Sequence, residues 1–271
     1  MMEILRLAWP IAAVLAFVLS WKVVARWWRM RKNRKADDRQ RDALVPLADS
    51  LGGTVVGSEA AAAWSAKLLG PLENHADDLT DKLMQRSRPR FDLALDFQCG
   101  PWHVRVSQAS MRQQTGNGVR RLQEHRIEVA TSLLAPMKIA RHAEIVFGGR
   151  VVTQRREAPA RPRTAEQNQA DWLPLRLPPS MDDEFVVAAS DLSSAARSFT
   201  LETLEWLLVR LNELPVLTHG RFMSLTFESG LVHATFPECI DPAVLISHVE
   251  TIIGLLDRMP DVRPRHPAVA V

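Results

Sequence analysis

The chain has 271 residues, 46% of them hydrophobic and 24% charged, which excludes a disordered or collagen-like protein and leaves room for one large or two small domains. Its two cysteines, Cys99 and Cys239, exclude a disulfide framework and any CxxC motif. The formal net charge is +3, but residues 22–41 carry +7 and the remainder carries −4. Because phosphate contacts need a basic face on the folded part, we expect no nucleic-acid partner.

The chain starts with a predicted membrane anchor. No charge occurs from Leu7 to Trp21, and extending this run to Ile4 and Val24 gives about 31 Å of helix, enough for a hydrocarbon core of roughly 30 Å. We therefore expect residues 1–28 to form an uncleaved transmembrane helix rather than a buried core helix or a cleaved signal peptide. Four tryptophans are the expected anchors at the membrane interface: Trp9, Trp21, Trp27 and Trp28.

A basic juxtamembrane segment, residues 29–42, follows the predicted anchor. Positive charge next to a transmembrane helix stays on the cytoplasmic side, so a single-pass protein of the cell membrane with a cytoplasmic folded part is expected. Anionic lipid headgroups are the expected partners of the cations at this position. These cations are Lys22, Arg26, Arg29, Arg31, Lys32, Arg34 and Lys35.

Residues 43–152 are predicted to form a first half of mixed helix and strand. A helix ends at Gly52-Gly53, and alternating apolar residues predict a hairpin between about 91 and 107 and a third strand ending near Val129. The other expected elements are a short strand at 54–56, helices at 59–69 and 74–87, and a fourth strand at 137–140.

Alternation in the hairpin and the third strand places charged side chains on one face of the sheet, with Phe91, Leu93 and Val104 on the other face. Mixed signs on neighbouring strands are typical of a solvated face, which is the expected environment, with a polar docking surface as the alternative. The charged residues are Asp92, Asp96, Arg105, Glu124, Arg126 and Glu128.

The second half follows a break in the pattern. Residues 153–180 are rich in proline and arginine and are predicted to be a flexible linker or long loop, and residues 261–271 a disordered tail. Between them, residues 181–260 predict a strand, a leucine-striped helix capped by Thr200, a hairpin around Gly230, and a helix capped by Asp241. The fold class is therefore α+β: an N-terminal transmembrane helix, then antiparallel hairpins packed with helices. The sequence leaves open whether the halves form one domain or two.

Asp77, Asp78 and Asp81 are the candidate metal ligands, because on a helix Asp77 and Asp81 lie one turn apart and carboxylates bind Mg²⁺. Their spacing resembles the DDxxD of prenyl-transferring enzymes, whose all-helical architecture the hairpins contradict. A solvated helix start is the expected role. No phosphate-binding loop, HExxH or GxSxG motif occurs, so no catalytic residue and no cofactor are predicted.

The order of elements resembles that of bacterial single-pass membrane proteins of unknown function. The resemblance rests on Leu51-Gly52-Gly53 after an N-terminal anchor and on the strand, leucine-rich helix, hairpin and final helix between Asp183 and Met259. It implies a membrane-tethered α+β domain. The expected function is a non-enzymatic interaction or scaffold module with a protein partner. The alternatives are a metal-dependent enzyme using Asp77, Asp78 and Asp81, and a sensor of anionic lipid surfaces.

Overall fold

A computed structural model describes residues 21, 24, 38–72, 87–115, 118–147, 150–154, 172–214 and 224–266. The chain divides into two units, residues 1–44 and residues 45–271. In the first unit, Trp21, Val24 and residues 38–44 are helical, and the rest of the predicted anchor and of the basic juxtamembrane segment lies outside the described residues. Among the residues given above, no helix combines the length and the apolar character that crossing a membrane requires.

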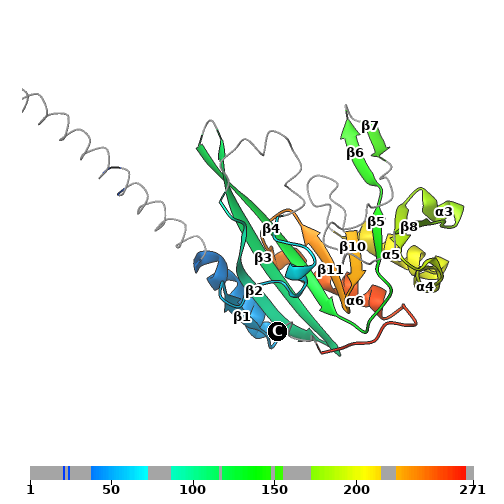
Figure 1. Cartoon of the computed structure of the whole chain (residues 1–271), viewed down its shortest axis with the longest axis horizontal. Coiled ribbons are helices and arrows are strands. Elements are labelled where there is room, and N and C mark those ends of the chain that lie inside the picture. The colour runs from blue at the N-terminus through cyan, green and yellow to red at the C-terminus, as the bar shows by residue number, and fades with distance from the viewer. Residues whose placement is uncertain are drawn as a thin grey trace, which may run out of the picture. The chain divides into compact units, whose positions relative to one another are not determined.

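The second unit contains an antiparallel nine-stranded sheet packed with helices, which confirms the predicted α+β class (Figure 1). The strand order is β1-β2-β3-β4-β11-β10-β5-β9-β8, and β6 and β7 form a separate pair. The strands are β1 (Thr54–Gly57), β2 (Arg90–Cys99), β3 (Trp102–Thr115), β4 (Gly118–Ala130), β5 (Met137–Arg141), β6 (Ala143–Phe147), β7 (Arg150–Gln154), β8 (Leu173–Leu175), β9 (Phe185–Ala189), β10 (Ser224–Glu228) and β11 (Leu231–Phe236).

The two predicted hairpins are confirmed. β2 pairs with β3 through a turn in which Gly100 has a φ of 56°, a left-handed conformation that glycine adopts without steric cost. β10 pairs with β11 in the same antiparallel way. A register shift between Phe91 and Leu93 moves Phe91 to the opposite face from Leu93, so these two residues do not share the face that strict alternation predicted.

Strands from the two halves of the sequence pair with each other. β11 lies beside β4 and β10 lies beside β5, so the second hairpin is inserted between two strands of the first half. β9 then pairs with the other edge of β5. Both halves of the sequence therefore contribute strands to a single sheet.

One face of the sheet is apolar and packs against helices α4 (Leu192–Ser198), α5 (Leu201–Glu213) and α6 (Pro242–Leu256). The ring of Phe199, which ends α4, contacts Phe227 of β10, and His248 of α6 stacks on Phe236 of β11. The predicted helix caps are confirmed: Thr200 Oγ1 accepts a hydrogen bond from the backbone of Thr203, and the Asp241 carboxylate accepts one from Ala243.

Residues 58–72, here called the strap, run across the other face of the sheet. Figure 1 shows this segment, in cyan, crossing in front of β4 and β11, whereas α6 lies behind them. The predicted helix at 59–69 is wrong, because only η1 (Trp64–Lys67), a single 3₁₀ turn, forms. Its amides at Trp64 and Ser65 donate to a glutamate of the sheet, which replaces the partners that a longer helix would supply.

The predicted linker and tail both contain ordered structure. Within residues 153–180, β8 pairs with β9, and α3 (Pro179–Asp182) begins before the predicted linker ends; residues 155–171 lie outside the described range. In the tail, the Arg263 amide donates to Ser132 Oγ and Pro264 forms a bridge with Thr131. Residues 261–266 are therefore attached to the end of β4 rather than disordered.

Candidate functional site

Most of the site residues predicted from the sequence lie outside the part of the chain that the structure describes. These are Asp77, Asp78 and Asp81, the seven cations from Lys22 to Lys35, and Trp9, Trp27 and Trp28. Trp21 is described, and 65% of its surface is exposed. Elsewhere in the described ranges, no group of three or more His, Cys, Asp or Glu side chains is arranged to hold a metal ion.

The charged face that was expected to be solvated is buried at its centre. Glu124, Arg126 and Glu128 of β4 are 2%, 1% and 0% exposed, so this expectation is wrong. The physical reason is the strap: Glu128 accepts hydrogen bonds from the amides of Trp64 and Ser65 at 2.7 and 2.8 Å. Buried carboxylates of this kind need such donors because water cannot reach them.

Arg126 completes this buried cluster and binds the strap at several points. Its guanidinium donates to Ser65 Oγ and to the carbonyl of Leu69, both at 2.8 Å, and to the carbonyl of Gly70 at 3.2 Å. It also lies 3.6 Å from Glu124, whose carboxylate accepts the amide of Leu72 at 2.7 Å.

The electrostatics of the cluster follow from its burial. Burial raises the pKa of Glu128, although the hydrogen bonds from Ser65 and the charge of Arg126 act in the opposite direction. Burial also lowers the pKa of neighbouring His233 to about 3, and the charges of Arg126 and Lys138 lower it further. Because the three charged groups are closed to solvent, the cluster fastens the strap and offers no surface to a substrate.

Two further residues of the predicted charged face, Asp96 and Arg105, lie at the exposed margin of the strap. Arg105 forms two hydrogen bonds with the Asp96 carboxylate, at 2.6 and 2.7 Å, and a third with the carbonyl of Ala62. Its guanidinium carbon also lies 5.4 Å from the ring centre of Trp64. This pair is partly solvated, as the sequence predicted, and holds the start of the strap.

A third arrangement of ionisable groups lies on the helix-covered face. The ring of Phe236 stacks between those of His125 and His248, with centroid distances of 4.9 and 4.7 Å. Burial lowers the pKa of His125 to about 4, even though a hydrogen bond with the carbonyl of Glu238 acts in the opposite direction. Burial lowers the pKa of His248 as well. Both imidazoles are therefore neutral near pH 7, as parts of the core.

Several arginines lie where β2 begins, β3 nears its end and β4 begins. We call this set of five the arginine end, in which Arg120 lies on the opposite face of β4 from Arg121: Arg88, Arg90, Arg112, Arg120 and Arg121. Strand register places Arg112 directly opposite Arg121 on one face. The Ser87 amide donates a hydrogen bond to the Arg112 carbonyl, and Ser87 Oγ accepts one from the Arg112 amide. These two bonds hold the segment that contains Arg88 beside the end of β3.

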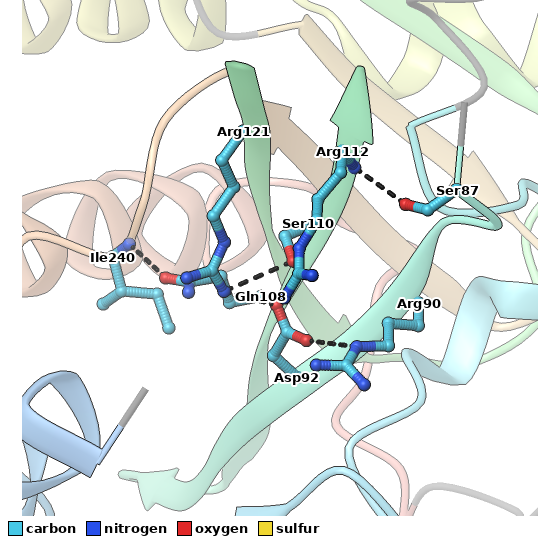
Figure 2. Close-up of polar contacts among 8 residues, drawn as sticks. All are labelled: Ser87, Arg90, Asp92, Gln108, Ser110, Arg112, Arg121 and Ile240. Carbon is cyan, nitrogen blue, oxygen red and sulfur yellow. Dashed lines mark hydrogen bonds and ion pairs between the residues drawn. The ribbon is translucent and has the colours of Figure 1, made fainter. Parts of the chain in front are cut away.

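The arginine end contains a buried acid, Asp92, whose side chain is 3% exposed, so the expectation that it lies on a solvated face is wrong. Figure 2 shows Arg90 and Arg121 on either side of this carboxylate, with bonds of 2.9 and 3.0 Å to its two oxygens. Arg121 also donates to Ser110 Oγ at 3.3 Å, and the side chain of Arg112 extends from β3 toward the same region. Nearby, the Gln108 side chain accepts the amide of Ile240, which holds the start of α6 against the sheet.

Charge at the arginine end is not balanced within the described residues. Arg88, Arg112 and Arg120 are exposed and form no ion pair with any other described residue. Arginines directly opposite each other on paired strands repel, so Arg112 and Arg121 lower the stability of the hairpin to some extent. The exposed guanidinium groups of this arrangement are suited to binding an anion.

The comparisons with known proteins assign no family. No family model matches the chain, and no curated protein matches it in sequence. One solved structure is similar, the crystal structure of the mycobacterial trehalose monomycolate transport factor A, TtfA. It is 12% identical, with a TM-score of 0.40, and the match covers 84% of this chain and 97% of that one.

The arginine end was not predicted from the sequence. A signal was present, because Arg86, Arg88 and Arg90 precede the predicted hairpin and Arg120-Arg121 begin the third strand. Arg112, however, stands alone in the sequence, and only the pairing register places it beside Arg121.

Proposed function

We propose that this chain is a membrane-anchored, non-enzymatic interaction module whose folded part binds another protein. The anchor is the uncharged run from Leu7 to Trp21 with its tryptophans, and the positive charge that follows places the folded part on the cytoplasmic side. Cations next to the anchor add contacts with anionic headgroups.

The arginine end is the observation that carries the interaction function. Outside residues 22–41 the chain has a net charge of −4, yet five arginines lie at one end of three paired strands. Exposed arginines are common in protein interfaces because the planar guanidinium forms paired hydrogen bonds and packs on apolar groups. The buried charged groups of β4, Glu124, Arg126 and Glu128, are occupied in holding the strap, which favours a binding role for the exposed arginines.

Photo-crosslinking of the full-length protein in its native membrane tests this proposal. Pro89, which is exposed within the arginine end, is replaced by a photoreactive phenylalanine, and Leu133, 71% exposed beyond the far end of β4, is replaced as the control. We expect discrete protein adducts from position 89 and none from position 133. Absence of adducts at position 89, or the same adducts from both positions, would refute an interface at the arginine end.

Topology is tested separately with reporters fused to the carboxyl terminus. A cytoplasmic folded part gives a fluorescent fusion protein and an inactive alkaline phosphatase fusion. Active phosphatase with a dark fluorescent fusion would overturn the proposed orientation, and loss of the protein from membranes on carbonate extraction would overturn the anchor.

A further inference from the structure

The guanidinium groups of Arg90, Arg112 and Arg121 lie on the same face of three neighbouring strands. Asp92 neutralises part of this charge, since its two oxygens are taken by Arg90 and Arg121. Arg112 pairs with no described carboxylate, and the side chain of Arg90 is 63% exposed. Two arginines therefore face solvent with donors to spare around a carboxylate that is already bound.

Asp92 also indicates which anion fits. A phosphate group carries up to two negative charges, and next to a buried aspartate it would be repelled more strongly than a single carboxylate. The existing contacts of Asp92 are themselves carboxylate–guanidinium pairs, with charge-assisted hydrogen bonds of 2.9 and 3.0 Å. The local chemistry thus favours further carboxylates.

The spacing of the arginines suits an extended acidic chain. Arg90 lies opposite Ser110, so Arg112 is its diagonal neighbour on the adjacent strand, at a separation of about 7–8 Å. Carboxylates at alternate positions of an extended peptide are separated by about 7 Å, a similar distance. From these observations we infer that the arginine end binds a segment of acidic polypeptide, in which successive Glu or Asp side chains pair with Arg112 and Arg90. This inference rests on the proposed function and specifies the chemistry of its partner.

The test uses the full-length protein in nanodiscs of phosphatidylcholine, a lipid whose headgroup has no net charge. Binding of a fluorescent octaglutamate peptide is measured by anisotropy at 50 to 300 mM salt for the wild type and for the double variant R90Q/R112Q. The control is R197Q, because Arg197 is equally exposed and pairs only with exposed Asp261 in the described structure. The basic segment at residues 22–41 is the same in every variant, so the difference between variants reports on the sheet.

We expect R90Q/R112Q to weaken peptide binding by about 3- to 20-fold at low salt, with a smaller difference at high salt, and R197Q to change it by less than about 2-fold. R112K keeps the charge but not the planar fork and is expected to lie between these values. The R90Q substitution removes one of the two partners of buried Asp92 and leaves Arg121 in place, so circular dichroism and the melting temperature are measured to verify that each variant is folded.

Three outcomes would overturn the inference. The first is equal peptide binding by wild type and R90Q/R112Q, and the second is an equal loss in R197Q, which would indicate a net-charge effect alone. The third is an Arg90- and Arg112-dependent attachment to vesicles containing phosphatidylglycerol that exceeds the binding of octaglutamate, which would identify a lipid headgroup instead. In the first two cases, protein adducts from position 89 would leave the interaction module standing and reject only its acidic partner.

Discussion

Replacing Arg126 by methionine provides a direct measure of how the strap is held. The substitution preserves much of the aliphatic bulk of the side chain but removes a cation that is 1% exposed and lies between two buried carboxylates. Glu124 and Glu128 would then carry unpaired charge, and three acceptors in the strap would lose their donor. Removing one partner of a buried ion pair typically costs about 3–5 kcal/mol, which is the destabilisation we expect.

The assay combines two measurements on the full-length protein in detergent. Guanidinium denaturation gives the loss in free energy of unfolding, and hydrogen exchange reports whether the strap opens before the rest of the fold. The amides of Trp64, Ser65 and Leu72, which donate to the two glutamates, should lose protection by a factor on the order of 10² to 10⁴, as about 3–5 kcal/mol implies.

Two further variants separate charge from packing. Arg105 contacts the same strap but its side chain is 15% exposed and its partner Asp96 is 30% exposed, so R105M should cost only about 1 kcal/mol. The triple variant E124Q/R126M/E128Q keeps acceptors for the strap amides and contains no buried charge, so it should recover at least half of the loss. A cost below about 1 kcal/mol for R126M, or a triple variant no more stable than R126M, would refute the argument.

Three more predictions concern the rest of the core. The pKa of His125 is lowered from 6.5 to about 4, so on acidification the unfolded state takes up the proton first. About 3 kcal/mol of stability is therefore lost as the pH falls from 6.5 to 4. The denaturation midpoints measured at these two pH values should differ less for H125N than for the wild type. G53A should unfold at least 5 °C below wild type in a thermal melt, because its Cβ would lie 2.5 Å from the Asp96 carbonyl oxygen, which is fixed backbone. G254A should cost less in the same measurement, because its Cβ meets the side chain of Trp206, which can move.

The sequence predicted the hairpins well because their signal is local. Alternation from Phe91 to Phe97 and from Trp102 to Val106 depends only on neighbouring residues, and the structure places both runs in paired strands. The same rule failed for the faces near Phe91, because a register shift in β2 leaves no mark in the pattern of apolar residues.

The environment of β4 was predictable only from what covers it. Glu124, Arg126 and Glu128 alternate as on any solvated strand, and nothing in them indicates that residues 58–72 cross above. The conformation of the strap is set by distant residues, because its backbone amides donate to side chains more than fifty positions away in the sequence. Contacts over such separations depend on tertiary structure, which local propensities do not encode.

The place of β10 and β11 in the sheet affects how the chain folds during synthesis. β4 and β5 are complete by residue 141, yet the strands that separate them are not available until residue 236 has been made. For about a hundred residues of translation, each of these strands has an open hydrogen-bonding edge, the kind of surface that recruits strands from other chains. A nascent chain of this topology depends on late closure across a long sequence separation, which slows folding. Chaperone binding to ribosome-bound chains should consequently be strongest between these two lengths and fall once the second hairpin has emerged.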